Sequence, residues 1–78
     1  MIRKIIIGVN PLKAMAYYIG QRAGESFVTA IVIDEKHLFK YGKTKYLIYI
    51  KHPIEGTMLW KSVEDMPVLI EHDCDFSN

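Results

Sequence analysis

The sequence predicts an α+β fold, with one short helix packed on a curved, mainly antiparallel β-sheet. The chain has 78 residues, which leaves room for one hydrophobic core and one domain over residues 1–78. Half of the residues are hydrophobic, which suffices for that core and is unlike a disordered chain. Short β-branched and aromatic runs follow one another between turn signals, and one segment has helical spacing. The predicted order is β-α-β-β-β-β-β, and a small barrel plugged by the helix is the alternative.

The N-terminal part of the chain is predicted to form a strand followed by a helix. Arg3–Val9 is β-branched and apolar, which is typical of a strand. Asn10 is a favoured helix N-cap, and a proline such as Pro11 suits the first helical position. The helix is therefore expected to span Pro11–Ala23 and to end at Gly24. Its apolar residues recur at spacings of three and four, as on one face of a helix. They are Leu12, Met15, Ala16, Ile19 and Ala23.

Five further strands are predicted after the helix. They are Phe27–Asp34, His37–Tyr41, Lys45–Lys51, Thr57–Lys61 and Val68–His72. The short turns between them favour antiparallel pairing, because a parallel pair needs a long crossover. Ser62–Pro67 is expected to form one helical turn capped by Ser62. Residues 73–78 are expected to fray.

The segment Lys45–Lys51 alternates clearly between two faces. We expect the core face to carry Tyr46, Ile48 and Ile50. The opposite face then carries Lys45, Tyr49 and Lys51 together with Leu47, a semi-exposed apolar residue that needs a neighbour within the chain or across an interface.

The composition favours a soluble cytoplasmic protein. No segment resembles a secretory signal, and no apolar run approaches the roughly 20 residues that span a bilayer. Cys74 is the single cysteine, so an internal disulfide is excluded. Charge is divided unevenly: Lys36–Ile54 holds five lysines and no acid, whereas Ser62–Asn78 holds five acids and no Lys or Arg. The two segments either attract oppositely charged partners or neutralise each other, within a monomer or across a dimer.

Catalysis, metal binding and cofactor binding find no support in the residue spacing. A nucleophile at Cys74 with His72 as its base would have acidic neighbours, which raise a thiol pKa. The three histidines and Cys74 lack the close ligand pairs of a zinc site. Glu64 and Asp65 suit the start of a helical turn. Neither of the common phosphate-binding motifs is present at the Gly8–Lys13 connection. We expect a protein that is not an enzyme and that uses no cofactor and no metal.

Protein binding is the function that this elimination favours. Nine aromatic residues and four methionines exceed what so small a core readily buries. We expect an accessory or regulatory factor that binds another protein, or a second copy as a homodimer, through a sheet face or edge. Small standalone domains of this kind are often carried by phages and other mobile elements. The candidate interface residues are Met58, Trp60, Leu47 and Tyr49. Trp60 is also compatible with a place in the core, and the benefit of so large a side chain to a small core slightly favours that place.

Single-stranded nucleic-acid binding is the alternative function. Lysines neutralise phosphates and exposed tyrosines stack on bases, and both residue types gather in one segment. Its candidate residues are Lys40, Tyr41, Lys43, Lys45, Tyr49 and Lys51. A strand edge protected by lysines explains the same pattern without any ligand.

Overall fold

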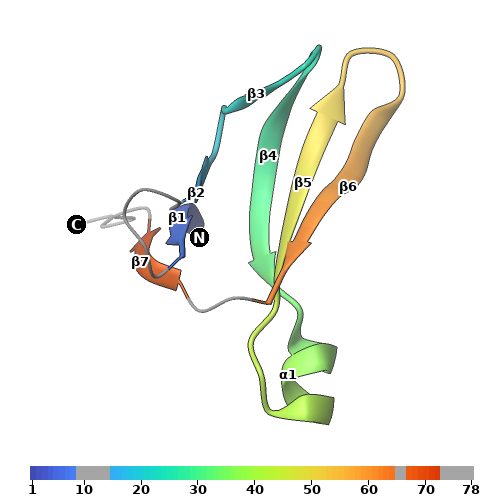
Figure 1. The fold of residues 1–78 in the computed structure, drawn as a ribbon. Coiled ribbons are helices and arrows are strands. Elements are labelled where there is room, and N and C mark those ends of the chain that lie inside the picture. Colours follow the sequence, from blue (N-terminus) through green and yellow to red (C-terminus); the bar gives the residue numbers. More distant parts are fainter. Residues whose placement is uncertain (9–14, 65–66, 73–78) are drawn as a thin grey trace, which may run out of the picture.

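The computed structural model describes residues 1–8, 15–64 and 67–72, and it shows a mostly β protein with one short helix (Figure 1). The predicted fold class is therefore confirmed, although the helix lies elsewhere in the chain. The elements are β1 Ile2–Ile7, β2 Met15–Tyr18, β3 Arg22–Ala23, β4 Ser26–Ile33, α1 Glu35–Tyr41, β5 Tyr46–His52, β6 Gly56–Val63 and β7 Pro67–His72.

The strands form two antiparallel sheets, β2-β1-β7 and β3-β4-β5-β6. The chain between β2 and β3 joins the two sheets through its backbone. The Ile19 N–H donates to the carbonyl of Arg3 in β1 at 2.9 Å, and the Gly20 N–H donates to the carbonyl of Val28 in β4 at 2.8 Å. One of the two sheets curls into a half-barrel, and the four-stranded sheet lies beside the smaller sheet (Figure 1).

The core lies between the two sheets. Its buried side chains come from both, and most of them are β-branched isoleucines and valine, which fit pleated surfaces. They are Ile2, Ile5, Ile7, Tyr17, Val28, Ile31, Tyr46, Ile48 and Ile50. The predicted core face of β5 is thus confirmed. On the other face Lys51 is exposed, and Leu47 and Tyr49 are half-buried.

The predicted helix over Pro11–Ala23 is wrong for the residues that the structure describes. Residues 15–18 and 22–23 form β2 and β3, and Tyr17 pairs with Ile5 across the first sheet. Met15, placed on the buried helical face by its spacing, is exposed, whereas Tyr17 is buried. Pairing with β2 satisfies the backbone groups along one edge of β1, which a helix could not do. Residues 9–14, with the expected cap Asn10, lie outside the described residues.

The helix forms instead where a strand over His37–Tyr41 was predicted. Asp34 caps it, because the Asp34 carboxylate accepts the His37 N–H at 3.2 Å. Gly42 ends it in the left-handed conformation at φ 67° and donates its N–H to the Leu38 carbonyl at 2.8 Å. No residue of α1 is buried, so the helix is held by its caps and not packed on the sheet as expected. The observed order is β-β-β-β-α-β-β-β.

The other predicted strands begin and end within two residues of the observed strands. β1, β4, β5, β6 and β7 all lie where strands were expected. The helical turn expected over Ser62–Pro67 is wrong at both of its ends, because Ser62 lies inside β6 and Pro67 begins β7. Residues 65–66 and the segment 73–78, predicted to fray, lie outside the described residues.

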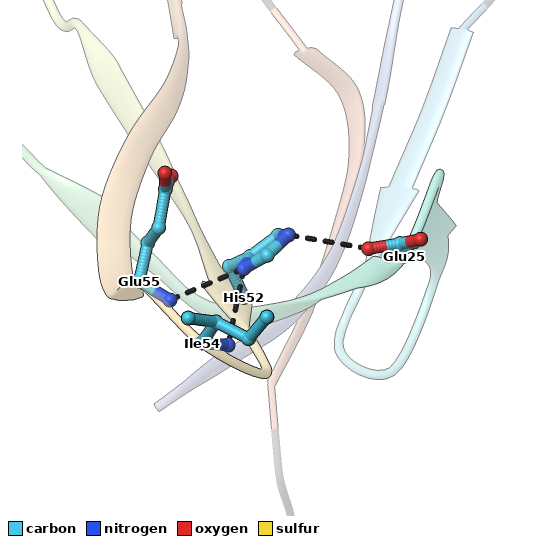
Figure 2. Close-up of polar contacts among 4 residues, drawn as sticks. All are labelled: Glu25, His52, Ile54 and Glu55. Carbon is cyan, nitrogen blue, oxygen red and sulfur yellow. Dashed lines mark hydrogen bonds and ion pairs between the residues drawn. The ribbon is translucent and has the colours of Figure 1, made fainter.

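The β5–β6 turn is organised by a histidine side chain (Figure 2). His52 Nδ1 accepts the N–H groups of Ile54 at 3.1 Å and Glu55 at 3.2 Å. An accepting Nδ1 carries no proton, so the N–H of the neutral ring lies on Nε2. That atom lies 3.4 Å from the Glu25 carboxylate in the β3–β4 turn. One imidazole therefore links two neighbouring turns at the same end of the sheet.

Replacing His52 with alanine is expected to lower the free energy of unfolding by about 1 kcal/mol. The loss is small because the backbone N–H groups of Ile54 and Glu55, which are exposed, then donate to water instead of His52 Nδ1. His52→Asn is the matched control, since an asparagine side chain accepts backbone N–H groups in the same kind of turn. Urea denaturation followed by circular dichroism measures both variants. Equal losses for alanine and asparagine would show that the two bonds contribute nothing to stability.

Tyr17 predicts a loss of stability at alkaline pH. Burial raises the pKa of the Tyr17 hydroxyl above its ordinary value of 10.0. The unfolded chain then loses this proton at lower pH than the folded chain does, so the contribution to stability is present below about pH 10 and is lost as the pH rises through the folded pKa. Unfolding free energies between about pH 9 and pH 11 should fall less steeply in Tyr17→Phe than in the wild type. Parallel curves for the two proteins would contradict this.

Candidate interaction surface

One face of the four-stranded sheet points away from the core, and we call it the outer face. Strand alternation and register place nine side chains on it in three cross-strand rows over β4, β5 and β6. The rows are Phe27, Lys51 and Thr57; Ala30, Tyr49 and Leu59; and Val32, Leu47 and Ser62.

Apolar side chains dominate the centre of the outer face. Phe27 is 42% exposed, Val32 41% and Leu59 49%. Leu47 and Tyr49 lie between them on β5 and are half-buried by these cross-strand neighbours. Within the described part of the chain, β5 makes its main contacts with its two neighbours in the sheet, β4 and β6. The outer face is therefore a continuous apolar surface open to solvent.

A lysine lies at each end of the outer face. Lys51 is opposite Phe27 in β4, and Lys45 precedes β5 by one residue. Neither lysine takes part in an ion pair among the described residues. Asp34 is opposite Lys45, because its N–H donates to the Lys45 carbonyl at 2.8 Å, but its carboxylate caps α1. None of the nine side chains in the three rows is acidic.

An open groove of about 610 Å³ lies at the Lys45 end, between α1 and the end of β6. His37 and Tyr41 form its helical wall, with ring centroids 4.8 Å apart. The His37 Nε2 atom is 3.7 Å from the carboxylate of Glu64, the one acid among the residues that line the groove. Lys43 and Lys45 complete the lining, so the groove is basic overall.

The predicted protein-interface residues do not form one surface. Leu47 and Tyr49 belong to the outer face, whereas Met58 is opposite the buried Ile50 and Trp60 packs against the core. Trp60 is the additional residue of a bulge, since Leu59 pairs with Tyr49 and Lys61 pairs with Ile48.

Trp60 lies between the two sheets. Its ring meets the ring of Tyr17 in β2 edge to face, at 5.9 Å between centroids and 81° between planes. The Lys61 ammonium lies 5.4 Å from the indole centroid. Of the two places that the sequence left open for Trp60, the structure shows the one against the core.

The predicted nucleic-acid residues are divided between two places. Tyr41, Lys43 and Lys45 line the groove beside α1, and the Lys40 ammonium lies 5.2 Å from the Tyr41 ring. Tyr49 and Lys51 lie on the outer face. Lys45 lies where the two places meet.

Comparison with family models, curated proteins and solved structures found no match. The function therefore has to be argued from the surface itself. In the described part of the chain, no helix is long and apolar enough to cross a membrane. The described residues include no group of three or more His, Cys, Asp or Glu side chains that could hold a metal ion. Cys74 and Asp65, which sequence analysis considered, lie outside the described residues.

Sequence reasoning missed Phe27, Val32 and Leu59 as members of the candidate surface. Their alternation in β4 and β6 was visible, but each strand contains a bulge that shifts its faces. The faces of β5 were predicted correctly, so pairing each neighbouring strand with β5 would have placed Phe27, Val32 and Leu59 on its outward side.

Proposed function

We propose that this protein binds another protein through the outer face and acts by binding, without catalysis of its own. The observation that supports this is the uncovered apolar centre formed by Phe27, Val32 and Leu59 around Leu47 and Tyr49. Contiguous exposed apolar surface with a polar rim is typical of protein interaction sites.

The outer face suits a partner that presents a sheet or a helix with an apolar face. Burying the remaining exposed area of one such leucine or phenylalanine contributes about 1–2 kcal/mol. The β-sheet holds these side chains in fixed rows, so little conformational entropy is lost when a partner covers them. The largest contributions are expected from Phe27 and Leu59, which lie on two different strands and have the most area left to bury.

Single-stranded nucleic acid is the second candidate ligand of the same face. Phe27 and Tyr49 offer two aromatic rings, and Lys51 lies directly opposite Phe27. Against it, Val32, Leu47 and Leu59 offer no ring for base stacking. The face also carries only two lysines, too few for strong phosphate neutralisation.

Leu59→Asn tests the proposal, with Leu69→Asn as a matched control. Leu69 lies on β7 in the other sheet and is exposed to a similar extent, 46% against 49%. We expect Leu59→Asn to weaken capture of a partner from a host extract about tenfold and Leu69→Asn to leave it unchanged. Quantitative mass spectrometry of the captured proteins measures this, and thermal denaturation confirms that both variants are folded. Equal capture by Leu59→Asn and the wild type would contradict the proposal.

A further inference from the structure

We infer that the partner of the outer face carries carboxylates on both sides of an apolar centre, and that it is a different protein and not a second copy of this chain. This rests on the proposed function and specifies its partner. The charges around the outer face support it.

Lys45 and Lys51 are six residues apart on one strand, which places them roughly 20 Å apart at opposite ends of the apolar centre. Both lack an ion pair among the described residues, and no acid lies in the rows between them. A partner that covers the centre brings its own rim close to both ammonium groups. Carboxylates at that rim fix the orientation of the partner and speed association.

The groove beside α1 extends the positive charge at the Lys45 end. Lys43 lines it together with Lys45, so two lysines outnumber the one acid of its lining, Glu64, whose carboxylate lies 3.7 Å from His37 Nε2. A carboxylate that enters the groove therefore meets two ammonium groups that the described residues leave without ion pairs. The Tyr41 ring, which is largely exposed, offers the adjacent apolar contact. The Lys45 end is thus built to take more than one acidic side chain.

A second copy does not satisfy these charges. Two identical sheets that pack face to face with their strands aligned are related by a two-fold axis. If the two β5 strands run in opposite directions, Lys45 of one copy approaches Lys51 of the other. If they run in the same direction, each lysine approaches its own copy. Both aligned arrangements bring like charges together, which opposes association, and in no arrangement do the three rows of a second copy supply a carboxylate.

A random peptide library displayed on phage tests the inference without a known partner. Peptides are selected on the wild type and kept when Leu59→Asn fails to bind them, which limits them to the outer face. We expect these peptides to be enriched in Asp and Glu on both sides of an apolar centre. The double variant Lys45→Glu/Lys51→Glu should bind them about tenfold more weakly and should itself select Lys and Arg. Lys36→Glu, which changes an exposed lysine of α1 outside the groove lining, is the control and should bind as the wild type does.

The outcomes separate the inference from the proposed function. Selected peptides without a charge preference would overturn the acidic partner and leave protein binding in place. A failure to select any peptide that depends on Leu59 would overturn both. A dimer in sedimentation equilibrium that Leu59→Asn dissociates would identify a second copy as the occupant. Oligothymidine binding that falls steeply with salt and is lost in Phe27→Ala would identify nucleic acid. Either of these last results would overturn the inference.

Discussion

Replacing Ile48 with alanine is expected to lower the free energy of unfolding by about 2–5 kcal/mol. Ile48 has no exposed surface, and it pairs with the buried Ile31 at the middle of the four-stranded sheet. The substitution removes buried methyl groups and leaves a cavity that strands held by two neighbours cannot close. A domain of this length has a total stability of roughly 4–12 kcal/mol, so this one change removes much of it. Equilibrium denaturation followed by circular dichroism measures the loss.

Two controls separate burial from a general intolerance to mutation. Ile48→Val removes a single methylene group and should cost about 0.5–1.5 kcal/mol. Val32→Ala removes apolar atoms from the outer face, where the side chain is 41% exposed, and should cost clearly less than Ile48→Ala. Val32→Ala and Ile48→Ala would be equally costly only if the outer face were covered in the free protein, which would contradict the surface described above.

Strong alternation made β5 the most predictable element of the fold. Tyr46, Ile48 and Ile50 are buried as expected, because β-branched and aromatic residues at every second position leave one choice of core face. Such a local pattern does not require knowledge of the neighbouring strands. β1 and β4 were recognised for the same reason, as runs rich in isoleucine and valine.

The segment over 11–23 was mispredicted because its pattern fits two structures. Met15, Ile19 and Ala23 recur at helical spacing, but Tyr17 and Tyr18 favour strands. Tertiary context decides between them. β1 has β7 on one side and needs a second partner on the other, and β2 supplies it. That requirement is invisible in a window of 13 residues.

The helix α1 was missed although both of its caps stand in the sequence. Asp34 was placed at the end of the predicted strand Phe27–Asp34, and Gly42 lay in the short turn predicted after His37–Tyr41. Both residue types are common in turns. The apolar residues between them then resembled a strand. The short helix buries none of these side chains, so no amphipathic pattern marks it. Capping residues eight positions apart were the signal that distinguished a helix from a strand.

The candidate surface could be predicted only in part, because it depends on how three strands align. Leu47 and Tyr49 follow from the alternation of β5 alone. Phe27 and Leu59 join them only through pairing with β5, and a bulge in each partner strand changes which residues face outward. The choice between Leu59 and Trp60 as the outward residue of β6 was open for this reason.

Replacing Trp60 with alanine is expected to lower the free energy of unfolding by about 2–4 kcal/mol. This is nearly as much as truncating a fully buried aromatic residue to alanine. The indole of Trp60 packs against the core and meets the Tyr17 ring of β2 edge to face. Residues of β2 and β6, together with the end of β1, also line an open cleft of about 320 Å³, and among the described residues β2 and β6 make few other contacts with each other. Removing the indole therefore frees one edge of the smaller sheet as well as removing apolar contact.

Hydrogen exchange distinguishes this role from simple packing. If β2 opens locally where it faces β6, the β2 amide groups of Trp60→Ala should exchange faster than the global loss of stability explains. The amide groups at the centre of β5 should exchange only through global unfolding. Trp60→Phe keeps a ring that can meet Tyr17 and should retain most of the protection in β2. A double-mutant cycle with Tyr17→Leu should give a coupling of about 0.5–1.5 kcal/mol for the ring pair. Additive losses, together with unchanged exchange in β2, would show that Trp60 fills core space without holding the two sheets together.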